Sequence, residues 1–161
     1  QCAKGLSVLQ ETYSDLMALA HANLTQLELV KNQLSSLEFN RCQFVIEEQQ
    51  RVLAAKSALE SSDMNRLGEL LFTSHQGLKA LYEVSCTELD FLVDQAKAHQ
   101  YVLGARMMGG GFGGCTINLI HKDHVGVFIS EVNQQFESKF GHTPTAIEIA
   151  LCNGTGFVEN H

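Results

Sequence analysis

The chain has 161 residues, a length typical of one domain, and 45% hydrophobic against 18% charged residues is an ordinary globular composition. This composition excludes a collagen-like repeat and a disordered tail. The 18 acidic residues outnumber the 11 basic ones and give a net charge of −7. Binding to nucleic acid is therefore not expected, because a phosphate backbone attracts clustered Lys and Arg.

The cysteines and the longest uncharged segment bear on the cellular compartment and on whether the chain could span a membrane. Five cysteines are spaced irregularly, at Cys2, Cys42, Cys86, Cys115 and Cys152. Their odd count and the lack of a C-x-x-C pair predict neither a disulfide framework nor a zinc site, so a reducing cytoplasm is expected. The longest uncharged stretch, residues 107–121, is too short and too rich in glycine to span a bilayer. The chain begins at Gln1 within a helical pattern and is interpreted as a fragment.

Residues 1–100 are expected to be mainly helical. The first 34 residues are irregular and predict two short helices. A long helix follows, because Ser35 and Glu38 have the spacing of a capping box. One stripe of this helix carries the apolar residues Cys42, Val45, Ile46, Val52, Leu53 and Leu59.

Two further helices are predicted before residue 100. Asp63 can cap the first, whose apolar face carries Leu67, Leu70, Leu71, Ser74, Leu78 and Leu81. The second is expected over residues 86–99, since Ser85 and Glu88 again have capping-box spacing.

From residue 101 onward the pattern changes to strand, loop, strand, helix, strand. Short runs of β-branched and aromatic residues predict strands near 104–108, 115–120 and 145–152. A helix is expected over 125–140, ended by Gly141. The chain is thus predicted to be a helix-rich α+β domain whose small antiparallel sheet is of ferredoxin-like type, with the last helix on one face.

A glycine block is the strongest local signal. It consists of Gly109, Gly110, Gly111, Phe112, Gly113 and Gly114. Glycines allow φ > 0 and let successive N–H groups converge on an anion, as in phosphate-binding loops. The block lacks the Lys of a P-loop and the following helix of a Rossmann fingerprint. The residue types alone leave two alternatives equally open, an anion site and a structural hairpin turn.

Other polar residues are assigned structural roles. Arg106 is expected to pair with an acidic helix face rather than with a phosphate, and His75 to be a packed or hydrogen-bonded helix residue. His121 and His124 have H-x-x-H spacing without a third ligand, so no metal site is predicted. The carboxylates Glu47, Glu48, Asp90 and Asp94 are interpreted as solvated, and Cys115 as a buried small hydrophobe.

Four segments together resemble the galactokinases of the GHMP kinase superfamily. Residues 104–120, GARMMGGGFGGCTINLI, resemble the third signature motif of that family. Residues 74–78 and 82–90 resemble its S-H-x-x-L and Y-E-V-S-C-P-E-L-D stretches, and residues 47–60 its T-E-N-x-R-V segment. The resemblance covers nearly the whole chain and is weakest over the first 35 residues.

The resemblance implies that residues 1–161 form the C-terminal domain of such an enzyme. The first and second motifs and the catalytic Asp are absent, so no catalytic and no metal-binding residue is assigned. The glycine block at Gly109–Gly114 is implied to lie at the domain junction, near the phosphates. Met108 stands where the family usually has Thr, and Thr87 where it usually has Pro.

The implied activity belongs to a longer parent protein. That parent would transfer the γ-phosphoryl group of ATP, with Mg²⁺, to the anomeric hydroxyl of galactose, and an N-terminal kinase domain of the same chain would be the partner. The fragment alone is expected to be inactive and to bind neither cofactor. The alternatives are a galactokinase-like sugar sensor or regulatory binding protein without kinase activity, and an amino-sugar kinase.

Overall fold

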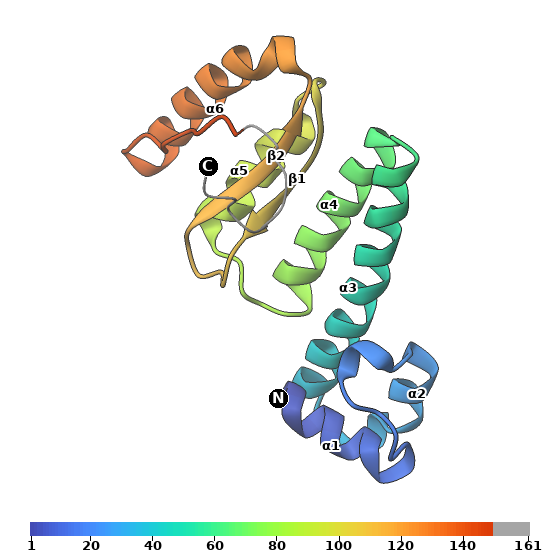
Figure 1. The fold of residues 1–161 in the computed structure, drawn as a ribbon. Coiled ribbons are helices and arrows are strands. Elements are labelled where there is room, and N and C mark those ends of the chain that lie inside the picture. Colours follow the sequence, from blue (N-terminus) through green and yellow to red (C-terminus); the bar gives the residue numbers. More distant parts are fainter. Residues whose placement is uncertain (150–161) are drawn as a thin grey trace, which may run out of the picture.

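The computed structural model describes residues 1–149, which contain six α-helices and a two-stranded sheet (Figure 1). The helices are α1 (Cys2–Thr12), α2 (Leu24–Leu29), α3 (Ser36–Glu60), α4 (Met64–Ala80), α5 (Thr87–Ala98) and α6 (Val125–Phe140). The strands are β1 (Val102–Met108) and β2 (Cys115–Ile120). They pair antiparallel, which confirms the helix-rich α+β class with a small antiparallel sheet.

The helices α1 and α2 pack around the first half of α3 and enclose a core of their own (Figure 1). Its buried residues include Leu9, Leu27, Cys42 and Ile46. The start of α3 has the predicted capping box, in which Ser35 and Glu38 exchange hydrogen bonds. Hydrogen bonds from Lys4 and Ser35 lower the pKa of Glu38 to about 2, so this carboxylate is charged at neutral pH and ties α1 to α3.

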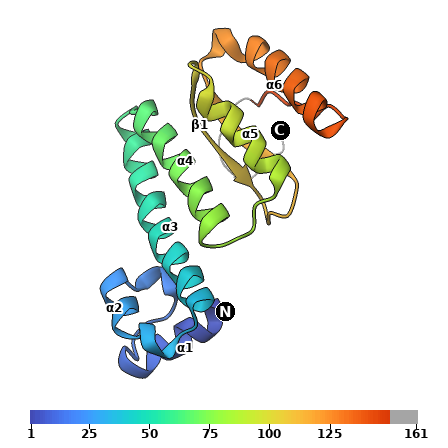
Figure 2. The same cartoon turned by 180° about the vertical axis from the view of Figure 1, so that it is seen from behind.

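The second part of the molecule is built on the α3–α4 hairpin and the sheet. Helix α4 lies beside β1, and α5 covers the sheet on the side that Figure 2 shows in front. Helix α6 packs on α5 through Phe91 and Phe136, whose ring centroids are 5.9 Å apart. Asp63 caps α4 and Gly141 follows α6 in the left-handed conformation with φ of 77°, both as predicted.

The free edge of β1 is covered by α4. The backbones of Gly68 in α4 and Gly104 in β1 approach so closely that a Cβ on either would overlap the other segment. Farther along this edge, the N–H of Met107 donates a 3.2 Å hydrogen bond to Nδ1 of His75. An exposed strand edge invites pairing with another chain, and here a helix occupies it.

The apolar stripe predicted for α3 is covered only over its first half. Cys42 and Ile46 are buried, whereas Val52, Leu53 and Leu59 are each more than half exposed. The reason is that α4 packs on a different face of α3, where Phe44 and Ala58 are buried.

Two other predictions are wrong. The capping box at α5 does not form, because the Ser85 hydroxyl donates to Asp90 and leaves Cys86 as an N-cap without a side-chain hydrogen bond. The third strand predicted over 145–152 is not seen in residues 145–149, which are mostly exposed and pair with neither strand. A segment whose apolar residues alternate with others does not form a strand unless a neighbouring strand can pair with it. Residues 150–152 lie outside the described part.

None of the helices within residues 1–149 combines the length and apolar character needed to cross a membrane.

Candidate functional site

The glycine block forms the exposed loop between β1 and β2. Five of its residues have positive φ, namely Gly109, Gly111, Phe112, Gly113 and Gly114. This left-handed backbone is what glycine permits without a steric penalty. Phe112 is the non-glycine member, with φ of 59° and a side chain that is 77% exposed.

One contact anchors this loop to the rest of the domain. The N–H of Phe112 donates a 2.7 Å hydrogen bond to the carbonyl of Val84, in the connection between α4 and α5. A Cβ at the neighbouring Gly111 would overlap that carbonyl. Around Gly109, Gly110 and Gly113, by contrast, a Cβ would meet nothing within 4 Å.

The glycine amides of the loop have no hydrogen-bond partner within the described part of the chain, since none of the five N–H groups donates in a turn or to a side chain. Such a cluster of main-chain N–H groups can bind the oxygens of an anion.

Arg106 does not supply a positive charge to the loop. Its guanidinium donates to Glu48 of α3 at 2.9 Å and to the carbonyl of Met107 at 3.0 Å. The expectation of an ion pair with a helix face is confirmed.

Glu48 is partly buried rather than solvated, so the interpretation of this carboxylate was wrong. Besides Arg106, it accepts from Ser74 at 2.6 Å and from Arg51 at 2.7 Å. Burial disfavours its charge, but these hydrogen bonds and the charge of Arg106 outweigh that cost and hold the pKa of Glu48 below its usual range. The carboxylate thus ties α3, α4 and β1 together.

His75 is a buried, hydrogen-bonded helix residue, as predicted, with 4% of its surface exposed. Its Nδ1 accepts from Met107, so the neutral ring carries its proton on Nε2, which lies 3.3 Å from Asp90. Burial lowers the pKa of His75 despite the attraction of Asp90. Asp90 also accepts from Ser85 and pairs with Lys79, so it is not the solvated carboxylate that was expected.

The remaining candidates lie apart from one another. Cys115 is exposed at the start of β2, contrary to the expectation of burial. His124 stacks on Tyr101, with ring centroids 3.3 Å apart. No group of three or more His, Cys, Asp or Glu side chains within residues 1–149 is arranged to hold a metal ion.

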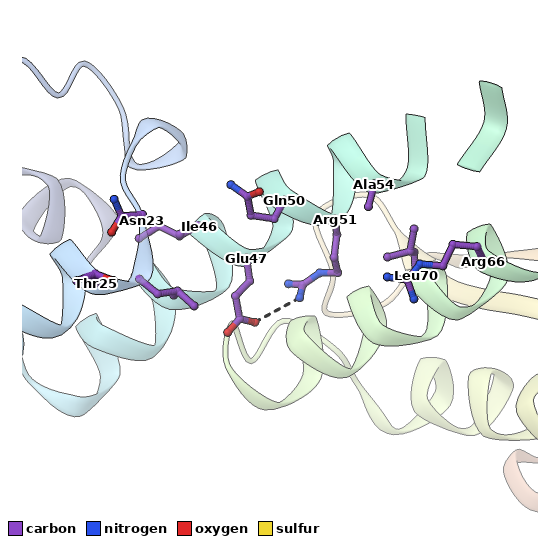
Figure 3. Close-up of a pocket in the computed structure, with 10 residues that line it drawn as sticks. Asn23, Thr25, Ile46, Glu47, Gln50, Arg51, Ala54, Arg66 and Leu70 are labelled. Atoms are coloured by element: carbon purple, nitrogen blue, oxygen red, sulfur yellow. Dashed lines mark hydrogen bonds and ion pairs between the residues drawn. The ribbon is translucent and has the colours of Figure 1, made fainter. Parts of the chain in front are cut away.

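Two hollows on the surface of residues 1–149 can be compared with the position of the loop. One of about 480 Å³ lies between α2, α3 and α4, where Arg51 turns toward Glu47 (Figure 3). It is lined by no residue of the glycine loop. The other, of about 380 Å³, lies beside the loop, and Arg41, Tyr82, Val84 and Phe112 line it together with the first residues of α1. The loop and the second hollow are therefore the candidate site.

Comparisons with known proteins identify the family of the chain. Residues 55–138 match the family model described as GHMP kinases C terminal. The chain is 35% identical over 156 residues to a galactokinase of Clostridium beijerinckii, covering 96% of this chain and 40% of that protein. It is 45% identical over 121 residues to a galactokinase of Thermotoga petrophila, covering 75% of this chain and 35% of the relative.

A solved structure shows the same fold. The galactokinase of Lactococcus lactis in complex with galactose superposes with a TM-score of 0.80 and 32% identity, over 87% of this chain and 36% of that one. The chain thus spans less than half the length of these relatives.

Proposed function

This chain belongs to the GHMP kinases through their C-terminal domain, and from this membership we propose that residues 1–161 are the C-terminal domain of a galactokinase. The longer parent would use MgATP to phosphorylate the anomeric hydroxyl of galactose. The proposal extends to a cytoplasmic parent, which fits the unpaired cysteines Cys2, Cys42, Cys86 and Cys115.

The observation that carries the proposal is the loop Gly109–Gly114. It lies inside the matched segment 55–138, in a stretch that resembles the third galactokinase motif, and its glycine amides have no partner among residues 1–149. Phosphoryl transfer depends on positioning and on stabilising the charge of the phosphate oxygens, which main-chain N–H groups can do.

The main-chain N–H groups of the loop suit the nucleotide phosphates and do not suit Mg²⁺. Main-chain N–H groups are donors, whereas Mg²⁺ takes oxygen ligands, and no suitable carboxylate cluster lies within residues 1–149. We therefore place the Mg²⁺ ligands, the catalytic Asp and the sugar-binding groups in the N-terminal kinase domain, the proposed partner of this surface. The role of Gly109–Gly114 is to close the site over the phosphates and exclude water.

The test compares the parent protein with the isolated chain. With galactose and ATP, the parent should form galactose 1-phosphate and ADP at equal rates, and the isolated chain should form neither. A panel of hexoses and amino sugars then identifies the preferred substrate. Galactose binding by the parent without turnover would contradict the kinase proposal and favour a sugar sensor.

A further inference from the structure

The connection between α4 and α5, residues 81–86, determines where the glycine loop is held. Within residues 1–149, the bond from Phe112 N–H to the Val84 carbonyl is the main-chain contact that joins the loop to another element. The residue just before Val84, Glu83, has φ of 54°. A non-glycine residue in this conformation is strained, and the surrounding structure must hold it there.

Arg41 is the side chain that holds this connection. It projects from α3 and is 12% exposed. One guanidinium nitrogen, Nη1, donates to the carbonyl of Leu81, and the other, Nη2, donates to the carboxylate of Glu83 at 2.6 Å. The guanidinium also lies over the ring of Tyr82, 5.7 Å from its centroid. One side chain thus contacts three consecutive residues of the connection.

We propose that Arg41 is a positioning residue for the glycine loop. By fixing Leu81 and Glu83, it sets the direction of the Val84 carbonyl, and that carbonyl fixes Phe112 and the loop around it. Arg41 itself does not touch the loop's glycines. This inference rests on the proposed function only where it concerns phosphoryl transfer, since the effect on the loop is a property of this chain.

The chemistry of the contact requires arginine. A guanidinium presents its N–H donors in a planar fork, and here two of them reach a carbonyl and a carboxylate on alternate residues. A lysine ammonium carries its three N–H donors on one nitrogen rather than in a planar fork, so it cannot make the same pair of bonds with the same geometry. The hollow beside the loop leaves Phe112 without close packing, so no dense core compensates for losing the Val84 contact.

The first measurement is local and does not need activity. In the full-length parent, hydrogen exchange at the Phe112 amide is compared between the unaltered protein, Arg41→Lys and Arg41→Met. We expect exchange at least about tenfold faster in Arg41→Met, with Arg41→Lys between the two, because loss of a charge-assisted hydrogen bond shifts a local opening equilibrium by that order. Exchange in the core around Leu27 should not change.

A matched control and a milder variant keep the test decisive. Arg66→Met removes an exposed arginine whose ion pair, among residues 1–149, is with Glu69 of its own helix, and it should leave Phe112 exchange unchanged. If Arg41→Met does not fold, Glu83→Gln removes the charge from the Nη2 partner and should still accelerate exchange. Unchanged exchange in the folded Arg41 variants, or equal acceleration throughout the domain, would overturn the proposal.

The second measurement is kinetic. In Arg41→Met, kcat per folded molecule should fall about tenfold, whereas KM for galactose should change less than twofold, because the sugar is held elsewhere. An unchanged kcat beside faster loop exchange would overturn the catalytic part of the inference. If even the unaltered parent has no kinase activity, the proposed function fails, while the exchange result still decides the role of Arg41.

Discussion

Two regions of this domain are rich in glycine for opposite reasons. Where α4 meets β1, Gly68 and Gly104 face each other, and a Cβ on either would overlap main-chain atoms of the other segment. In the loop beyond β1, Gly109, Gly110 and Gly113 have open space where a Cβ would project. The first pair is explained within the chain by backbone packing. Positive φ explains glycine at Gly109 and Gly113, so Gly110 is the open position that the chain itself does not explain. We infer that the N-terminal domain and its nucleotide lie against it.

The largest effect on stability is expected where α4 packs against β1. Gly68→Ala should lower the free energy of unfolding of this chain by about 3 kcal/mol or more, because the new Cβ displaces β1 from α4 and no side-chain rotation can relieve the overlap. Urea unfolding followed by circular dichroism measures this loss. Gly126→Ala, where a Cβ meets nothing within 4 Å, serves as the matched control inside a helix. Equal stability of the two variants would show that the close approach does not limit stability.

Gly111→Ala tests the one packed glycine within the loop. Its φ of 83° and its contact with the Val84 carbonyl both disfavour a Cβ. We expect a loss of about 2 kcal/mol, smaller than for Gly68 because a surface loop can move. The same urea titration applies. Gly113→Ala is the comparison, because φ there is 137° but a Cβ would meet open space. If Gly111→Ala lowers the free energy of unfolding by less than Gly113→Ala does, the role of the Val84 contact is contradicted.

Gly110→Val separates activity from stability. Gly110 has neither a positive φ nor a neighbour within 4 Å, so the thermal midpoint of the chain should hardly change. In the parent, kcat/KM should fall at least about tenfold if the loop approaches the phosphates closely. An unchanged kcat/KM would remove the loop from the site, and parallel losses of activity and stability would favour a purely structural turn.

The smallest effect is expected at the connection that faces the loop. Thr87 is the exposed first residue of α5, and Cys86 before it is extended, with φ of −137° and ψ of 170°. Thr87→Pro should therefore stabilise the chain by about 0.5 kcal/mol, since proline suits the first helical turn and its predecessor is already in the required region. A decrease in the urea midpoint would show that the connection needs a different backbone.

The sequence predicted best those features that depend on neighbours along the chain. The capping box of Ser35 and Glu38 and the cap at Asp63 formed as expected, because both partners lie within one helical turn. The glycine block was identifiable from composition alone. The cap at Ser85 failed because its hydroxyl had a competing partner, Asp90, five residues ahead.

Features that depend on distant segments were not predictable. Glu48 resembled a solvated helix carboxylate, but two of its partners, Ser74 and Arg106, are 26 and 58 residues away. The stripe on α3 was recognised, but helical periodicity does not tell which face a neighbouring helix covers. Nothing in the local pattern of Arg41 indicated its contact with Leu81 and Glu83, which depends on how the α4–α5 connection passes α3.

The exposed ring of Phe112 has a spectroscopic consequence. The chain contains no tryptophan, so Phe112→Trp would give it a single indole at the tip of the glycine loop. The large exposure of this side chain implies that an indole there would emit at long wavelength while the loop faces water. Its emission would shift to the blue once another surface covered the loop. Because the side chain of Phe112 packs against little within this domain, fluorescence from an indole at this position would show when a second domain covers the loop.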